Sequence, residues 1–196
     1  MPDPITTLAS TAQYAAWAAM YGLATAPTGM ALALAQATAE LQGFCGRDFL
    51  PSPAAVNTTE ARQYLGNGAA VLVIDDCLTL TSITCAGAPV TDHQKEPLGE
   101  TPTTRLRRTD YTWTEGAVII VTGRFGYAEQ AALPAAVVEA CCMLAALRCN
   151  DGASWAHLGV KSVQAGSLAR VDYDNSGQDP KRAAALALAR PYRRNF

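Results

Sequence analysis

The sequence predicts an α+β protein, mainly a helical bundle with an inserted small antiparallel β-unit and a C-terminal hairpin plus a basic helical tail. Three observations support this fold class. Alanine-rich, helix-forming stretches lie on both sides of the middle of the chain. The middle is rich in threonine, valine and glycine and has the period of strands. The last residues are basic and aromatic. With 196 residues, the chain is long enough to bury a core as one domain.

The composition indicates a globular protein in which any contact with nucleic acid or an anionic membrane must be local. Apolar residues make up 49% of the chain and charged residues 16%, which argues against wholesale disorder. The net charge of −2 gives no global reason to bind nucleic acid or an anionic membrane. Residues 4–39 carry no charge, but no basic region precedes them, and Gly22, Pro27 and Gly29 interrupt them. We therefore expect a soluble protein with neither a signal peptide nor a membrane span.

Two helices are predicted in the first quarter of the chain. The first covers about residues 6–23, with Thr6 or Thr7 as its N-cap. The second covers about residues 27–45, and Gly46 is its expected left-handed cap. Apolar residues recur in the second helix at steps of four and three, which places them on one core-facing side. These residues are Met30, Leu34, Ala37, Leu41 and Phe44.

The small antiparallel β-unit is predicted over about residues 59–123. Residues 59–65 and 71–74 have the pattern of two strands, and the Gly-Asn-Gly turn between them predicts a hairpin. Two more strands are expected on either side of Glu115-Gly116. The segment 91–108 is polar and contains prolines, so we expect it to be an exposed loop.

A third helix is predicted over about residues 134–149, with Pro134 in its first turn. Its only charged residues are Glu139 and Arg148, so this helix is apolar on nearly all sides and must be enclosed by protein. We expect it to be the central helix. A second short hairpin should follow, and Asp179-Pro180 then supplies a cap and a first-turn proline for a final helix.

The six cysteines do not have the spacing of a metal site or of a disulfide framework. No two of them form a Cys-x-x-Cys pair, and only His93 and His157 are available as further ligands, which is the wrong pattern for zinc. Free cysteine in an apolar run behaves as a small hydrophobic residue. We expect buried thiols in a reducing compartment, with no metal and no cofactor. The cysteines are Cys45, Cys77, Cys85, Cys141, Cys142 and Cys149.

No group of residues in the sequence predicts catalysis. The chain lacks a Gly-x-Ser-x-Gly elbow, a His-Glu-x-x-His motif and a phosphate-binding loop. His93 lies near Asp92 and Glu96, but no nucleophile accompanies them. Asp75 and Asp76 end a strand, where adjacent side chains point to opposite faces. We therefore expect that the protein is not an enzyme.

Six stretches, taken in order, carry a family resemblance: ELQGFCGRDF, QYLGNGAAVLVID, LTSITCAGAPV, VIIVTGRFGY, LPAAVVEACCMLAA and AALALARPYRR. With them the chain resembles, over nearly its whole length, the phage head-tail connector (adaptor) family of long-tailed siphophages and gene-transfer agents. The resemblance implies a structural ring, usually of twelve copies, in the virion neck under the portal. Such a ring extends the DNA channel and presents a surface to the next neck or tail protein, a stopper or tail terminator.

The resemblance has further implications for partners and location. DNA passes through such a ring without sequence-specific binding, no membrane is involved, and assembly takes place in the host cytoplasm. We expect a single adaptor domain over residues 1–179 and a basic docking helix and tail over residues 180–196. Another neck or tail-completion protein, which binds a tube end or DNA through its basic tail, is the alternative function.

The basic C-terminal segment is the main candidate site. Its arginines alternate with aromatic residues, the types most enriched at binding hot spots, and Pro191 limits the chain freedom that docking would remove. The resemblance also implies that such tails dock onto the portal. A solvated basic tail without a partner is the simpler reading of the composition. The predicted docking residues are Arg190, Pro191, Tyr192, Arg193, Arg194 and Phe196.

A second basic cluster consists of Arg105, Arg107 and Arg108. If this segment is extended, Arg105 and Arg107 project to one side, where an acidic partner or DNA phosphates would meet them. Exposed loops also carry such residues without any function. The cluster is therefore a secondary contact candidate.

Overall fold

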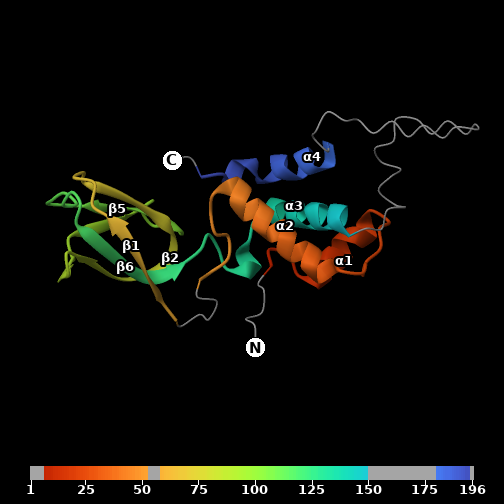
Figure 1. The fold of residues 1–196 in the computed structure, drawn as a ribbon, viewed down its shortest axis with the longest axis horizontal. Coiled ribbons are helices and arrows are strands. Elements are labelled where there is room, and N and C mark those ends of the chain that lie inside the picture. The colour runs from red at the N-terminus through yellow and green to blue at the C-terminus, as the bar shows by residue number, and fades with distance from the viewer. Residues whose placement is uncertain (1–6, 53–57, 150–179, 195–196) are drawn as a thin grey trace, which may run out of the picture. The chain divides into compact units, whose positions relative to one another are not determined.

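The computed structural model describes residues 7–52, 58–149 and 180–194. The predicted second hairpin, Thr6 and Phe196 lie outside the described residues. The chain divides into two compact units (Figure 1). The helical unit comprises Met1–Cys45 and Pro134–Phe196, and the sheet unit comprises Gly46–Leu133.

The fold class predicted from the sequence needs a correction. The protein is α+β, but the β-structure is not a small insertion in a helical bundle. Within the described residues it is a six-stranded antiparallel sheet that forms a compact unit with its own core. The sheet is larger than predicted because residues 91–108, which we expected to be an exposed loop, contribute two of its strands.

The helical unit contains four described α-helices. They are α1 (Thr11–Met20), α2 (Met30–Cys45), α3 (Ala135–Arg148) and α4 (Pro180–Ala189). The short 3-10 helix η3 (Arg190–Tyr192) continues directly from α4. Figure 1 shows α2 and α3 lying side by side, and the two helices pack against each other.

Helix α1 starts later than the sequence suggested. Ser10 is its N-cap rather than Thr6 or Thr7, because Ser10 and Gln13 form a capping box. The backbone N–H of Gln13 donates to Ser10 Oγ at 3.1 Å, and the backbone N–H of Ser10 donates to Gln13 Oε1 at 2.8 Å. The hydroxyl of Thr7 instead donates to the carbonyl of Ala9. Two reciprocal bonds outweigh a single threonine cap.

Helix α2 confirms the predicted core-facing side. Leu34, Ala37 and Leu41 are fully or almost fully buried, and Met30 and Phe44 are half-buried. The helix begins at Met30 and not at Pro27. Its end at Gly46 is as expected, since Gly46 has a φ of 62°, which a residue without a side chain adopts without strain.

Helix α3 is the central helix of its unit, as predicted. It packs against α1, α2 and α4, and seven of its residues are buried. A buried contact between the Thr38 hydroxyl and the Cys141 thiol, at 3.7 Å, links it to α2. The buried residues are Val137, Ala140, Cys141, Cys142, Leu144, Ala145 and Ala146.

The sheet has the strand order β1-β6-β2-β5-β4, and β3 pairs with the end of β2. Every pairing is antiparallel. The long strand β2 pairs first with β5 and then with β6, and register shifts mark the change of partner. The strands are β1 (Glu60–Leu65), β2 (Val71–Cys85), β3 (Ala88–Pro89), β4 (His93–Glu96), β5 (Thr103–Arg108) and β6 (Val118–Phe125), followed by the 3-10 helix η1 (Gln130–Ala132).

Two local predictions in this unit were wrong. Strands β1 and β2 are not a hairpin, because β6 lies between them. Gly66 is needed for close backbone approach rather than for a hairpin turn: a Cβ there would lie 1.8 Å from the Thr114 carbonyl oxygen. Only one strand, β6, adjoins Glu115-Gly116, since the residues before them fold as irregular chain that carries Trp113 into the core.

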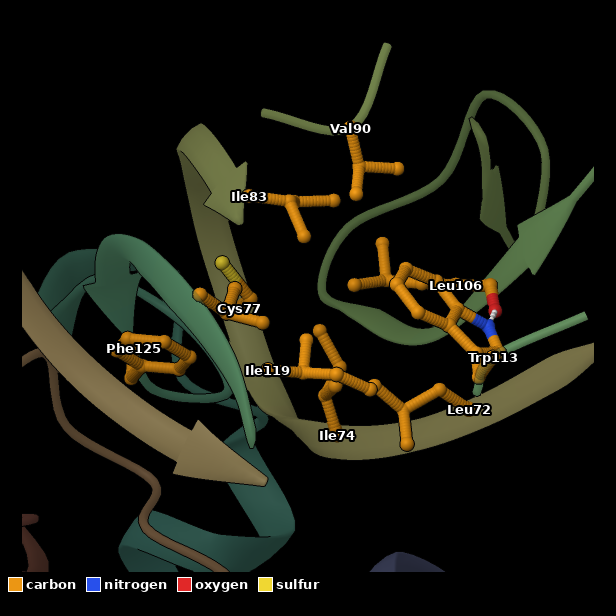
Figure 2. Close-up of a cluster of buried hydrophobic side chains, with 10 residues drawn as sticks. Leu72, Ile74, Cys77, Ile83, Val90, Leu106, Trp113, Ile119 and Phe125 are labelled. Carbon is orange, nitrogen blue, oxygen red and sulfur yellow. Dashed lines mark hydrogen bonds between the residues drawn. The ribbon is translucent and has the colours of Figure 1, made fainter. Parts of the chain in front are cut away.

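The core of the sheet unit is built on one face of β2, β5 and β6 (Figure 2). Trp113 is fully buried among these side chains, and its indole N–H donates to the carbonyl of Leu106 at 3.0 Å. This bond satisfies the one polar atom that the indole brings into the core. The buried cluster is Leu72, Ile74, Cys77, Ile83, Val90, Leu106, Trp113, Ile119, Val121 and Phe125.

Candidate interaction surface

The predicted docking segment lies along the helical unit. Helix α4 packs against α3 and α2, and η3 follows without a break. The side of α4 that faces the unit carries Ala185 and Ala189, both with 0% exposure. Leu186 and Leu188 are half-buried. The helix therefore rests mainly on small side chains, which permit a close approach to the neighbouring helices.

The chain beyond α4 is attached to the end of α2. The backbone N–H of Arg194 donates to the carbonyl of Cys45 at 2.8 Å. The Cys45 thiol donates to the carbonyl of Ala189 at 3.5 Å. The guanidinium of Arg193 lies over the ring of Phe44, 5.7 Å from its centroid. These contacts hold the segment up to Arg194 in a defined place.

The cationic side chains of this segment differ in their surroundings. Arg190, Pro191 and Arg193 are exposed, whereas Tyr192 and Arg194 are half-buried. Within residues 7–52, 58–149 and 180–194, no carboxylate forms an ion pair with Arg190 or Arg193. Two exposed guanidinium groups on a fixed backbone, without an acidic partner in the part of the chain that the structure describes, form a surface suited to carboxylates of another molecule.

Arg182, at the start of α4, forms an ion pair within the helical unit and is not available to a partner in the way that Arg190 and Arg193 are. Arg182 donates to Glu40 of α2 at 2.5 Å, and Arg148 of α3 donates to the other oxygen of the same carboxylate. Burial alone would raise the pKa of Glu40, but the hydrogen bonds from Arg148 and Arg182 outweigh it and lower the pKa. Glu40 is therefore ionised well below neutral pH.

The second basic cluster does not act as one surface. It lies on strand β5 and not in a loop, and Arg105 and Arg107 project to the exposed face while Leu106 is buried, as the extended alternative predicted. Arg107 pairs with Glu96 at 2.5 Å. Arg108 lies on the other face, where it pairs with Asp92 at 2.7 Å. Among the described residues, only Arg105 in this cluster is exposed without an acidic partner.

Aromatic contacts explain why Arg108 is unavailable to a partner. Its guanidinium lies 5.3 Å from the ring centroid of Trp113 and 5.4 Å from that of Tyr111. The side chain is 13% exposed. Arg108 thus covers the core tryptophan and belongs to the fold of the sheet unit.

The acidic residues considered for catalysis are engaged in ion pairs. Asp75 accepts hydrogen bonds from Arg62 at 3.0 Å and from Tyr64 at 2.9 Å. Asp76 is buried and pairs with Arg47 at 3.4 Å. The two carboxylates therefore point to different partners, as predicted for adjacent residues of a strand. The prediction that they end a strand was wrong, because β2 continues through them to Cys85.

His93 gives the sheet unit a pH dependence. Among the described residues its buried Nδ1 has no hydrogen-bond partner. Burial, and then the nearby charge of Lys95, lower the pKa of His93 below its ordinary 6.5. Arg108 acts in the same direction, and the Val90 backbone and Asp92 act against it.

We expect the free energy of unfolding to fall as the pH drops below about 6.5. In this range His93 binds a proton more readily in the unfolded chain than in the folded protein, where the pKa of its imidazole is lower. The stability that neutral His93 provides is complete above that pH. Urea unfolding of wild type and His93→Gln between pH 7 and about pH 5 measures this effect, and the variant should show the smaller loss. Equal losses in the two proteins would contradict the assignment to His93.

The six cysteines are free thiols, and all but Cys85 are buried, which confirms the interpretation as buried thiols. No group of three or more metal-binding side chains occurs among the described residues. In the same residues, no helix has both the length and the hydropathy needed to cross a membrane.

The basic segment was visible in the sequence, but the α2 residues that hold it in place were not. Glu40, Phe44 and Cys45 of α2 contact residues that lie more than a hundred positions later. One signal was present: Glu40 is the only charged residue between Asp3 and Arg47. A single carboxylate in an otherwise uncharged helix has to find a cationic partner or remain in solvent.

Comparisons with protein-family models and with curated proteins found no match to this sequence. Among solved structures, this chain is similar to a chain in the neck of an empty gene transfer agent (GTA) particle, computed with C6 symmetry. The TM-score is 0.53 and the sequence identity is 14%. The match covers 95% of this chain and 89% of that chain. A chain in the neck of a native GTA particle, computed with C12 symmetry, has a TM-score of 0.49 and 14% identity, with 86% and 84% covered.

A chain from the virion of a native GTA particle has a TM-score of 0.44 and 15% identity, with 86% of this chain and 78% of that chain covered. At such low identities, similarity is evidence about the fold alone. The likeness with the TM-score of 0.53 spans both the helical unit and the sheet unit, since it covers 95% of this chain. This protein therefore shares its fold with a chain of the GTA neck.

Proposed function

We propose that this protein is a structural head-tail connector, or adaptor, in the neck of a phage or a GTA particle. Copies of it form a ring, of twelve members, under the portal. The ring extends the DNA channel and offers the attachment surface for the next neck or tail protein, a stopper or tail terminator. The observation that carries this proposal is the shared fold with a GTA neck chain over 95% of this chain. The sequence motifs described above point to the same family.

Exposed apolar side chains on both units support the proposed ring. Each copy in a ring uses two different faces, one for each neighbour, because the contact is heterologous and closes by rotation. The helical unit exposes Met20 and Leu32, and the sheet unit exposes Leu65 and its cross-strand partner Val118. Apolar side chains with such exposure on both units suit contacts with neighbouring copies.

The basic segment supports docking onto the portal. Arg190 and Arg193 present guanidinium groups to solvent, and the bond between Arg194 and Cys45 fixes their backbone. A fixed backbone lowers the entropy that is lost on binding. The net charge of −2 suits a channel through which DNA slides without adhering.

Deleting residues 191–196 tests the docking role. We expect the truncated protein to stay folded. The deletion removes a backbone hydrogen bond to Cys45, worth about 1 kcal/mol, and the contact between Arg193 and Phe44, but none of the side chains described over residues 191–194 is fully buried. Its melting temperature should stay within a few degrees of wild type, while its affinity for the cognate portal protein falls at least about tenfold.

A variant that lacks only residues 195–196 serves as the control for shortening the chain. An unfolded 191–196 deletion would show that this segment is part of the core. Unchanged portal affinity would show that it is not a docking segment. Binding to DNA or to a tail-tube end in place of the portal would favour the alternative neck or tail-completion function.

A further inference from the structure

Three helices of the helical unit meet at one carboxylate. Helix α2 has a single charged residue, Glu40. Arg148 comes from α3 and Arg182 from α4, and the two guanidinium groups bind different oxygens of Glu40. The Glu40 side chain is only 14% exposed, so this ion-pair network is partly shielded from water.

The two arginines do not have the same exposure. Arg148 is 28% exposed and also donates to the Leu144 carbonyl of its own helix. Arg182 is 58% exposed. Salt screens exposed pairs more strongly than shielded ones. The pair between Glu40 and Arg182 is therefore the weaker and more salt-sensitive member of the network.

Helix α4 has little apolar area with which to hold itself in place. Among its side chains whose burial is described, only the alanines Ala185 and Ala189 are fully buried, while Leu186 and Leu188 are half-buried. A buried methyl group contributes far less than a fully buried leucine. Polar contacts fix its two ends: Arg182 binds Glu40 at the first turn, and Arg194 binds the Cys45 carbonyl just after the helix. A helix with such small contact residues can slide or lift unless its ends are fixed.

We propose that Glu40 is a positioning residue for the docking segment: by binding Arg182 it fixes α4 on α2, so that Arg190 and Arg193 are presented in one defined arrangement. This proposal rests on the proposed function, because the arrangement matters only if a partner binds there. The hydrogen bonds that lower the pKa of Glu40 keep its carboxylate charged at neutral and mildly acidic pH. The contact is thus present under ordinary conditions and is weakened by salt.

The first experiment measures amide hydrogen exchange of α4 and η3 in the full-length protein. Arg182→Gln removes the α4 member of the network, and Arg148→Gln removes only the α3 member. We expect Arg182→Gln to speed exchange over residues 183–194 by about three- to tenfold at low salt, and less at high salt. Arg182→Lys retains the charge and should lie close to wild type.

Two controls separate positioning from general loosening. Arg107→Gln removes an exposed arginine–glutamate pair of the sheet unit and should leave α4 exchange unchanged. The double variant Glu40→Gln, Arg182→Gln should exchange in α4 no faster than Glu40→Gln alone, because both changes remove the same contact. The proposal would be overturned if amide exchange over residues 183–194 were as slow in Arg182→Gln as in wild type. It would also be overturned if Arg148→Gln sped this exchange as much as Arg182→Gln does.

The second experiment measures affinity of the same variants for the portal protein. We expect Arg182→Gln to bind about three- to tenfold more weakly than wild type, and Arg182→Lys to recover most of the loss. If Arg182→Gln loosens α4 but binds the portal as wild type does, Glu40 does not position the docking residues, although docking itself stands. If wild type does not bind the portal, the proposed function fails, and the exchange data alone decide whether Glu40 fixes α4.

Discussion

Replacing Trp113 with alanine is expected to destabilise the sheet unit by about 3–5 kcal/mol, the cost of truncating a large aromatic side chain in a core. Trp113 is the largest fully buried side chain among the described residues. Its removal leaves a cavity, takes away the hydrogen bond to the Leu106 carbonyl, and uncovers the guanidinium of Arg108. Because the cavity, the lost hydrogen bond and the lost cation–π contact all lower the free energy of unfolding, this substitution has the largest expected effect on stability.

Urea unfolding followed by circular dichroism measures the loss, and amide exchange in β2, β5 and β6 assigns it to the sheet unit. Tyr111→Ala is the matched control, because Tyr111 stacks on the same arginine but is 67% exposed. It should cost less than about 1 kcal/mol. A Trp113→Ala protein as stable as the Tyr111→Ala protein would contradict the assigned core.

Reversing the charge of Arg190 and Arg193 together is expected to abolish portal docking. Truncating one hot-spot arginine costs 2 kcal/mol or more, about thirtyfold in affinity, and reversal adds repulsion from the acidic partner. The combined loss for Arg190→Glu, Arg193→Glu should exceed about a hundredfold. Neither side chain is buried, so the melting temperature should change little.

Arg105→Glu is the matched control for this charge reversal. It places the same substitution at an exposed arginine without a described acidic partner, on strand β5 of the sheet unit. Binding of all variants is measured by titration against the purified portal protein. The site assignment would be wrong if Arg105→Glu weakened docking as much as the double variant did, or if the double variant bound normally.

The helical unit could largely be predicted because its signals are local. The steps of four and three in α2 brought Leu34, Ala37 and Leu41 to one buried side. The near absence of charge in α3 indicated a helix enclosed by its neighbours, which it is. The predicted start of α1 was wrong because Thr6, Thr7 and Ser10 are all residue types that cap helices well. Only Ser10 has a glutamine three residues later, which completes a capping box.

The sheet could not be predicted in the same way, because strand pairing joins residues far apart in the chain. The Gly-Asn-Gly segment has the composition of a hairpin turn, yet β6, some fifty residues later, inserts between β1 and β2. Residues 91–108 looked like a loop because β4 is a polar edge strand and β5 buries only alternate residues, such as Leu106. Polar edge strands carry little of the periodic signal that identifies buried ones.

The candidate site was visible in the sequence as composition but not as structure. The alternation of arginine, proline and tyrosine marked the C-terminal segment. The three arginines of β5 looked equivalent, but strand pairing gives Arg107 a glutamate, Arg108 an aspartate and two rings, and leaves Arg105 exposed. The contact between Arg182 and Glu40 joins residues 142 positions apart, a relation that no local pattern contains.

The central claim, that this protein is a ring-forming adaptor at the portal, is tested most directly by mixing the purified protein with the cognate portal and imaging the complex by electron microscopy. We predict additional density of closed ring shape, coaxial with the portal, in which residues 190–194 of each copy contact the portal and an open axial channel continues through both rings. Portal particles without bound protein at saturating concentrations, or copies bound singly without forming a ring, would contradict the account.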